Sequence, residues 1–159
     1  MIFFPSRKNF YLFVLLISLI TILSALYVEF VLQYKPCKLC IYQRVPYICA
    51  IIFSFLGFNY FKNDNILIIL IIIFILSAIL SGYHFGIENS FFDELSSCSN
   101  NSLEPSNKKE LLESLNKNMP VSCKDATFKI LGVSLAAINT ILSVLIVIIS
   151  VRKLGYEKN

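Results

Sequence analysis

Four long apolar runs constrain the fold of this chain more than any other feature. They cover about residues 10–30, 41–61, 66–85 and 128–151. Each has about 20 residues, enough for a helix to cross the hydrocarbon core of a bilayer. Only 15% of the 159 residues are charged, against about 25% in a soluble domain. The sequence therefore predicts an all-α fold, a four-helix transmembrane bundle, as one membrane domain of residues 1–159.

One connection between the runs is long, the outer loop of about residues 86–127. Connections of that length in compact proteins are usually functional. Inside it, Asn107 and Glu110 have the spacing of a capping box, and Pro120 ends the pattern that follows. The apolar residues of this pattern share one helix face: Leu111, Leu112, Leu115 and Met119. We expect a short amphipathic helix here, lying either on the membrane surface or against protein.

The distribution of charge indicates the orientation in the membrane. Lysines and arginines near span ends gather on one side: Arg7, Lys8, Lys62, Arg152, Lys153 and Lys158. Cytoplasmic loops carry such an excess, so both termini are expected to be cytoplasmic. The bias is modest, because the opposite side also carries lysines. The net charge of +4 does not indicate a nucleic-acid partner, and we expect none.

Four of the five cysteines fall in the two loops of the opposite side. Cys37 and Cys40 lie before the second run, and Cys98 and Cys123 lie in the long loop. Such thiols stay reduced in the cytosol and can pair in an oxidising compartment. We therefore expect periplasmic cysteine loops in a multi-pass protein of the bacterial inner membrane. Cys49, inside the second run, is interpreted as a small buried apolar side chain.

The spacing Cys-x-x-Cys at the start of the second run favours redox chemistry. Cys40 is expected in the first helical turn, where backbone amides stabilise a thiolate. Closing the ring between Cys37 and Cys40 would add only about 2 kcal/mol of stability, so the pair suits reactivity better than stapling. Arg44 follows one turn later on the same face. It either binds an electron-rich oxygen of a small acceptor or extends its side chain to the membrane interface.

Two other uses of the cysteines stay open at this point. Cys98 and Cys123 form either a structural bridge across the long loop or a disulfide presented to a partner. Four thiolates also match the count of a Cys₄ zinc site, but the second pair lacks the close spacing of a zinc knuckle, and we expect no metal. The chain has no nucleotide or haem motif. A lipid-soluble quinone near Arg44 would then be the electron acceptor.

Three stretches resemble the DsbB family of quinone-linked disulfide oxidoreductases: residues 36–44, residues 82–88, and residues 123–139. The resemblance implies a quinone-dependent membrane enzyme (thiol:quinone). Such an enzyme reoxidises a soluble periplasmic dithiol oxidant, a thioredoxin-fold, DsbA-like thiol oxidase. Electrons would pass through two cysteine pairs to a membrane quinone, ubiquinone or menaquinone.

The resemblance also implies a role for each cysteine of the two pairs. The thiol of the partner would attack Cys98 and form a mixed disulfide. Cys123 would then exchange with Cys37, and Cys40 would become a thiolate that faces the quinone.

The same resemblance assigns Arg44 to quinone binding and places His84 near the quinone. A lone histidine at a span end is more often a hydrogen-bonded residue of the interface. The alternative function is a non-enzymatic small membrane protein with structural loop disulfides. A reductase that runs electrons outward is disfavoured, because only Cys49 lies within the spans.

Overall fold

The computed structural model describes residues 6–60, 63–92, 129–130 and 133–158. Within these residues, four helical spans are long and apolar enough to cross a membrane. The predicted all-α four-helix transmembrane bundle is therefore confirmed. The amphipathic helix predicted in the long loop falls outside the described residues.

The helices keep close to the predicted spans, with one exception at the fourth. Their bounds are α1 (Arg7–Phe30), α2 (Lys38–Tyr42), α3 (Arg44–Asn59), α4 (Asp64–Glu88) and α6 (Leu135–Lys158), and α2 and α3 together make the second span. Two short strands, β1 (Lys129–Ile130) and β2 (Val133–Ser134), precede α6.

The fourth span begins at Leu135 instead of at about residue 128. Strands β1 and β2 pair antiparallel, with Lys129 opposite Ser134 and Ile130 opposite Val133. The side chain of Ser134 accepts a hydrogen bond from the backbone N–H of Ala137 at 3.2 Å, as a helix N-cap does. Hydropathy does not distinguish a short apolar strand from the first turns of an apolar helix, and this explains the difference.

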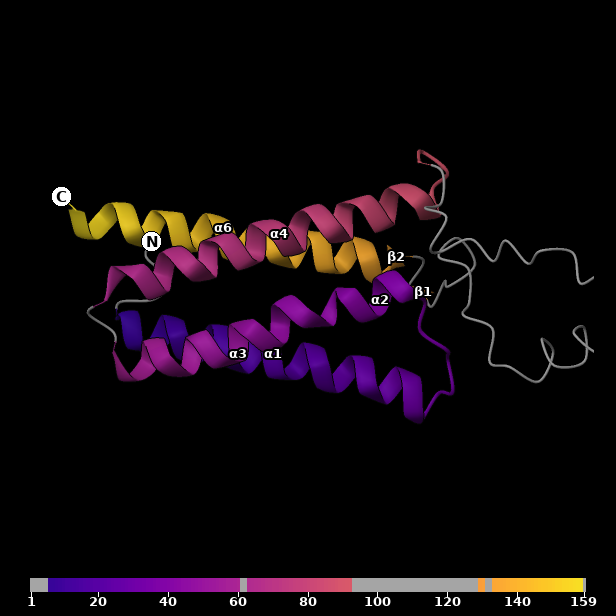
Figure 1. Cartoon of the computed structure of the whole chain (residues 1–159), viewed down its shortest axis with the longest axis horizontal. Helices are drawn as coiled ribbons and strands as arrows, with labels where there is room; N and C mark the ends of the chain where they lie inside the picture. Colours follow the sequence, from indigo (N-terminus) through magenta and orange to yellow (C-terminus); the bar gives the residue numbers. More distant parts are fainter. Residues whose placement is uncertain (1–5, 61–62, 93–128, 131–132, 159) are drawn as a thin grey trace, which may run out of the picture.

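The spans pack in chain order, α1 against α3, α3 against α4 and α4 against α6 (Figure 1). The start of α1 and the end of α6 lie at one end of the bundle. The start of α2, the end of α4 and the start of α6 meet at the other end. Residues that are far apart in the sequence therefore come together at this second end.

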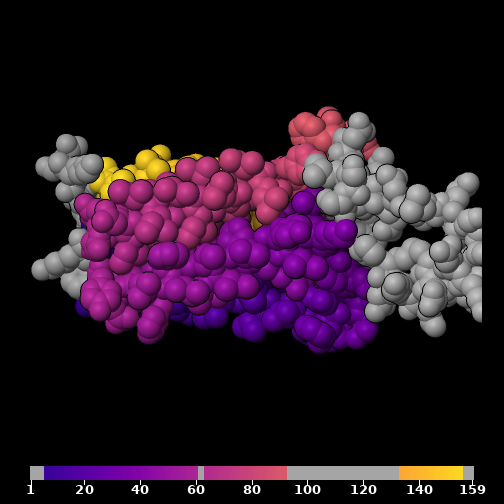
Figure 2. Space-filling model, in the orientation of Figure 1, coloured from indigo at the N-terminus to yellow at the C-terminus, as the bar shows by residue number. Residues whose placement is uncertain are grey.

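The interior of the bundle is narrow, and many large apolar side chains point outward. The buried core consists of Phe10, Tyr11, Val14, Tyr47, Ala50, Leu67, Leu70, Phe74 and Ile146. Helices α3 and α4 lie side by side over one outer face (Figure 2), and Phe55 and Ile79 are more than 60% exposed on their helices. In a bilayer such a surface faces lipid, whereas in water it would promote association.

One glycine and one ion pair connect the first span closely to its neighbours. A Cβ atom on Gly57 would lie 2.6 Å from the ring of Tyr11, so α1 and α3 need a glycine at their contact. At the end of the bundle where α1 begins and α6 ends, Arg7 of α1 and Asp64 of α4 form an ion pair of 2.6 Å.

Candidate functional site

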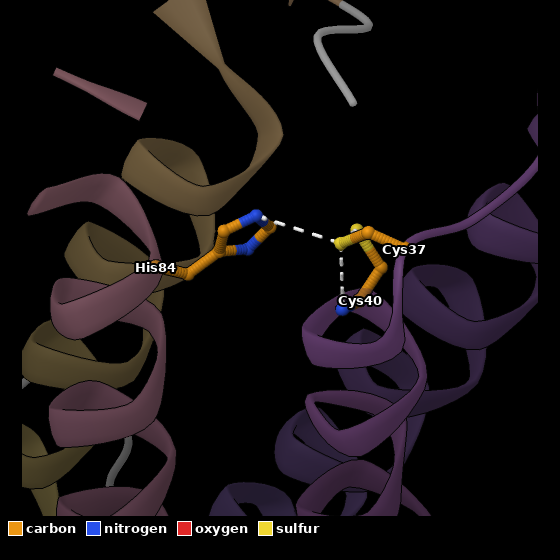
Figure 3. Close-up of side chains that lie close together, drawn as sticks. All are labelled: Cys37, Cys40 and His84. Atoms are coloured by element: carbon orange, nitrogen blue, oxygen red, sulfur yellow. Dashed lines mark hydrogen bonds between the residues drawn. The ribbon is translucent and has the colours of Figure 1, made fainter. Parts of the chain in front are cut away.

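The Cys37–Cys40 pair lies at the first turn of α2 (Figure 3). Cys37 is the N-cap, and its sulfur accepts the backbone N–H of Cys40 at 3.2 Å. This bond satisfies one of the amides that a helix start leaves without a partner. The two sulfur atoms lie 2.6 Å apart, with Cys37 fully buried and Cys40 partly exposed. The predicted place of Cys40 in the first helical turn is confirmed.

His84 reaches the sulfur pair from the last turns of α4. Its ring is 2% exposed and points across to the thiols, with Nε2 at 3.6 Å from the sulfur of Cys37 (Figure 3). Nε2 also lies 3.7 Å from Oε1 of Glu88, one turn further along α4. His84 is thus a buried, hydrogen-bonded residue beside the Cys-x-x-Cys pair at the end of its span.

A directed chain of hydrogen bonds fixes the proton of His84. The hydroxyl of Tyr47 donates to Oδ1 of Asn139, and Nδ2 of Asn139 donates to Oε1 of Gln43 at 3.2 Å. Nε2 of Gln43 then lies 2.9 Å from Nδ1 of His84. An amide nitrogen only donates, so Nδ1 accepts and a neutral His84 carries its proton on Nε2. That proton faces the sulfur of Cys37.

The chain of polar contacts continues into the bundle beyond Tyr47. Its hydroxyl lies 3.5 Å from the hydroxyl of Ser143, which lies 3.1 Å from that of Ser77. These contacts join α3, α4 and α6 through buried side chains. In a bilayer, where water is absent, such polar pairs are a main source of specific helix packing.

A break in the second span directs Gln43 inward. Pro46 lacks a backbone N–H, and its ring would clash with the carbonyl of Tyr42 in a continuous helix. Helix α2 accordingly ends at Tyr42, and α3 begins at Arg44. Gln43, at the break, is 9% exposed and lies between His84 and Asn139.

Arg44 opens α3 and pairs with a carboxylate of the first span. Its Nη1 lies 2.5 Å from Oε2 of Glu29, and the two side chains are 20% and 27% exposed. From its position in the sequence, Arg44 either binds an electron-rich oxygen of a small acceptor or extends its side chain to the membrane interface, and neither alternative names a partner for it. The structure gives it a partner on α1, which compensates its charge and fixes its guanidinium at the rim of the site.

The structure brings together Cys37, Cys40 and His84, with Arg44 nearby. Cys98 and Cys123 lie outside the described residues. Their loop follows Phe92, whose ring stacks on Tyr83 at 5.6 Å near the end of α4. Cys49 lies on α3, half-buried and deeper in the second span.

Sequence reasoning assigned no role to four residues that the geometry places around the site: Glu29, Gln43, Glu88 and Asn139. Their signal was available, because each is a polar or ionisable side chain within or at the end of an apolar span. Such residues are costly in a bilayer and usually face the bundle interior with a partner.

Comparison with known proteins gives two matches. The family model for "Disulfide bond formation protein DsbB" matches residues 7–152. An uncharacterised protein of Rickettsia prowazekii (strain Madrid E), RP370, is 32% identical over 146 residues, which cover 90% of this chain and 85% of that protein. No solved structure matches the chain.

Proposed function

The chain belongs to the family of disulfide bond formation protein DsbB, and on this premise we propose that it reoxidises a soluble periplasmic dithiol oxidant at the expense of a membrane quinone. The family implies disulfide bond formation at a membrane. One observation supports the finer proposal most strongly. The two sulfurs of Cys37 and Cys40 lie 2.6 Å apart where the second span begins, beside the oriented N–H of buried His84.

The proposed route begins at the loop cysteines. A thiolate of a DsbA-like partner attacks Cys98 of a Cys98–Cys123 disulfide, forms a mixed disulfide and releases Cys123. The thiolate of Cys123 attacks Cys37 of the Cys37–Cys40 disulfide and releases Cys40 as a thiolate. The second thiol of the partner then attacks the mixed disulfide and releases Cys98, which attacks Cys123 and releases Cys37. Over a full cycle the partner loses two electrons and two protons, and re-formation of the Cys37–Cys40 disulfide passes them to the quinone.

The residues around the inner pair suit this chemistry. The backbone amides at the start of α2 stabilise negative charge on sulfur. The Nε2–H of His84 points at the sulfur of Cys37 and would donate to the charge on that sulfur when it is later released from Cys123. Gln43 and Asn139 hold that ring in place, so the donor needs little reorganisation during the reaction.

A quinone fits the surroundings of Cys40. Ile41, Tyr42 and Val45 are at least half exposed on the same segment, and they offer an apolar surface to a molecule that arrives through the lipid. The guanidinium of Arg44 is the donor that would hold a carbonyl oxygen of the quinone, with His84 close by behind the sulfur of Cys37. When bound there, ubiquinone or menaquinone would supply an acceptor for two electrons and two protons.

The proposal is tested by anaerobic turnover. Purified protein is mixed with a reduced thioredoxin-fold partner and ubiquinone, and quinone absorbance and partner thiols are followed together. We expect one quinone reduced for every two partner thiols oxidised. If neither changes, the chain is better described as a non-enzymatic membrane protein with structural loop disulfides.

Arg44→Ala should raise the KM for quinone by about 10–100-fold, since a hydrogen bond from a charged group contributes about 1.5–3 kcal/mol. Steady-state kinetics over a range of quinone concentrations measures this. Glu29→Gln is the matched control, because it removes the carboxylate of the ion pair and keeps the guanidinium. It should change KM far less. Equal effects of the two variants would mean that Arg44 acts only through its ion pair.

A further inference from the structure

We propose that the dithiol form of this protein binds a zinc ion between Cys37, Cys40 and His84. The two sulfurs and a ring nitrogen of His84 all lie within 4.8 Å of one another. Thiolate and imidazole are the donors that zinc prefers, and Cys-x-x-Cys is a spacing that zinc sites use. This donor set differs from the Cys₄ site considered from the sequence, since it needs neither loop cysteine.

Three distances between possible zinc ligands can be compared with those of a tetrahedral site. Two of them agree, and the sulfur–sulfur distance does not. Ordinary zinc bond lengths place a sulfur and a nitrogen ligand about 3.6 Å apart, and a nitrogen and an oxygen ligand about 3.4 Å apart. Sγ of Cys37 lies 3.6 Å from Nε2 of His84, which lies 3.7 Å from Oε1 of Glu88. The sulfurs, at 2.6 Å, would need to separate to about 3.8 Å, which rotation of the partly exposed Cys40 side chain allows.

Glu88 is the second observation that points to a cation. Its side chain is 6% exposed, and its Oε2 is buried with no hydrogen-bond partner among the described residues. A buried carboxylate oxygen without a partner is costly. A zinc ion beside His84 would compensate that charge. Glu88 stands outside the cluster of three close donors, and a movement of its side chain toward the sulfurs would make it the fourth ligand.

The backbone contributes to the same site. The N–H of Cys40 already donates to the sulfur of Cys37, and this bond strengthens when the sulfur is a thiolate. Gln43 occupies Nδ1 of His84, so Nε2 is the ring nitrogen directed at the sulfurs. For Nε2 to bind the metal as a neutral imidazole, the ring proton moves to Nδ1, and the amide of Gln43 flips so that its oxygen accepts that proton.

Binding of zinc would be gated by the redox state of the pair. Zinc displaces the two thiol protons of Cys37 and Cys40, while His84 keeps its one ring proton on Nδ1, with no change in oxidation state. The Cys37–Cys40 disulfide removes two of the three donors, so the oxidised protein cannot form the site. Occupied thiolates also cannot pass electrons on, so zinc would inhibit turnover. This inhibition rests on the proposed function, whereas the binding does not.

The test uses the full-length chain with Cys98→Ser and Cys123→Ser, so that the loop thiols cannot bind metal. Reduced, anaerobic protein is titrated with Co²⁺, which reports thiolate ligation by charge-transfer absorption, and then with Zn²⁺. We expect one cobalt per chain, displaced by zinc, and no such absorption after Cys37 and Cys40 are oxidised.

Three further substitutions locate the metal. His84→Ala removes a ligand and should weaken zinc binding by at least about 100-fold. Glu88→Gln should weaken it by about 10–100-fold, the usual effect of losing a residue that supports a ligand. Cys49→Ser is the matched control, since it removes a thiol of the same span outside the site, and it should leave affinity unchanged. Helix content by circular dichroism shows that each variant is folded.

Three results would overturn the proposal: no cobalt or zinc bound by the reduced protein, equal binding by the oxidised protein, or affinity insensitive to both His84→Ala and Glu88→Gln. Quinone reduction by the metal-free wild-type protein is measured in parallel. Failure of zinc binding with normal quinone reduction contradicts only the metal site. Zinc binding without quinone reduction contradicts only the proposed function.

Discussion

Replacing Cys40 with serine should lower quinone reduction by at least about 1,000-fold, as the loss of a nucleophile does in other enzymes. A hydroxyl oxygen forms no disulfide with Cys37 and offers no electron pair of comparable reactivity. The loss should appear with either a protein dithiol or a small dithiol as the donor, because both need the inner pair. Stopped-flow measurement of quinone absorbance under anaerobic conditions gives the rates.

Cys98→Ser separates the outer pair from the inner one. It should abolish quinone reduction driven by the thioredoxin-fold partner and preserve reduction driven by dithiothreitol, which can reach Cys37 and Cys40 directly. Cys49→Ser should retain both activities. Stoichiometric partner oxidation that survives Cys98→Ser would contradict the assigned route, and turnover by Cys40→Ser would contradict the assigned exit of electrons.

His84→Ala should slow electron transfer from the reduced inner pair to quinone by about 100-fold or more, within the range that a positioned acid–base group contributes. The variant removes the side chain of α4 whose Nε2 lies 3.6 Å from the sulfur of Cys37. A single turnover from dithiothreitol-reduced protein isolates this step from the exchange with the outer pair.

Gln43→Leu is the companion to this variant. It keeps the imidazole and removes the group that sets its tautomer, leaving Nδ1 of His84 and Nδ2 of Asn139 without their present partner. Each such loss costs about 1–3 kcal/mol. We expect a smaller rate loss than in His84→Ala. Gln43→Glu should not recover the rate, because an ionised carboxylate only accepts and reverses the hydrogen bond to Nδ1. If the rates follow only the thermal stability of the variants, His84 has a structural role alone.

Hydropathy and motif spacing predicted the spans and the place of the sulfur pair. Long apolar runs determine helices in a bilayer, since only internal hydrogen bonding is available there. Cys37 and Cys40 could be placed because a loop must end where an apolar run begins. The start of α6 was predicted too early, because residues 129–134 are apolar enough for a strand or for a helix. The hydrogen bond that the side chain of Ser134 accepts from the backbone of Ala137 marks the actual start of the helix.

The contacts of the site could not be obtained in the same way. A helix that faces lipid on one side and protein on the other is apolar around most of its circumference, so its periodicity does not reveal which face turns inward. The meeting of Gln43, His84 and Asn139 depends on three helix rotations and on the break caused by Pro46. Likewise, the pairing of Arg44 with Glu29 requires knowing that α1 lies beside α3.

The hydrogen-bonded line from Tyr47 to Cys37 has a consequence for biosynthesis. Asn139 and Ser143 belong to α6, which leaves the ribosome after α3 and α4, yet they complete contacts made by residues of those two helices. A nascent chain that has inserted only its first three spans holds its thiols without a fixed histidine tautomer. The hydrogen bonds around His84 are therefore completed late, when α6 docks against the earlier spans. A shortened chain ending before Asn139 would insert and still lack the partner that holds Gln43.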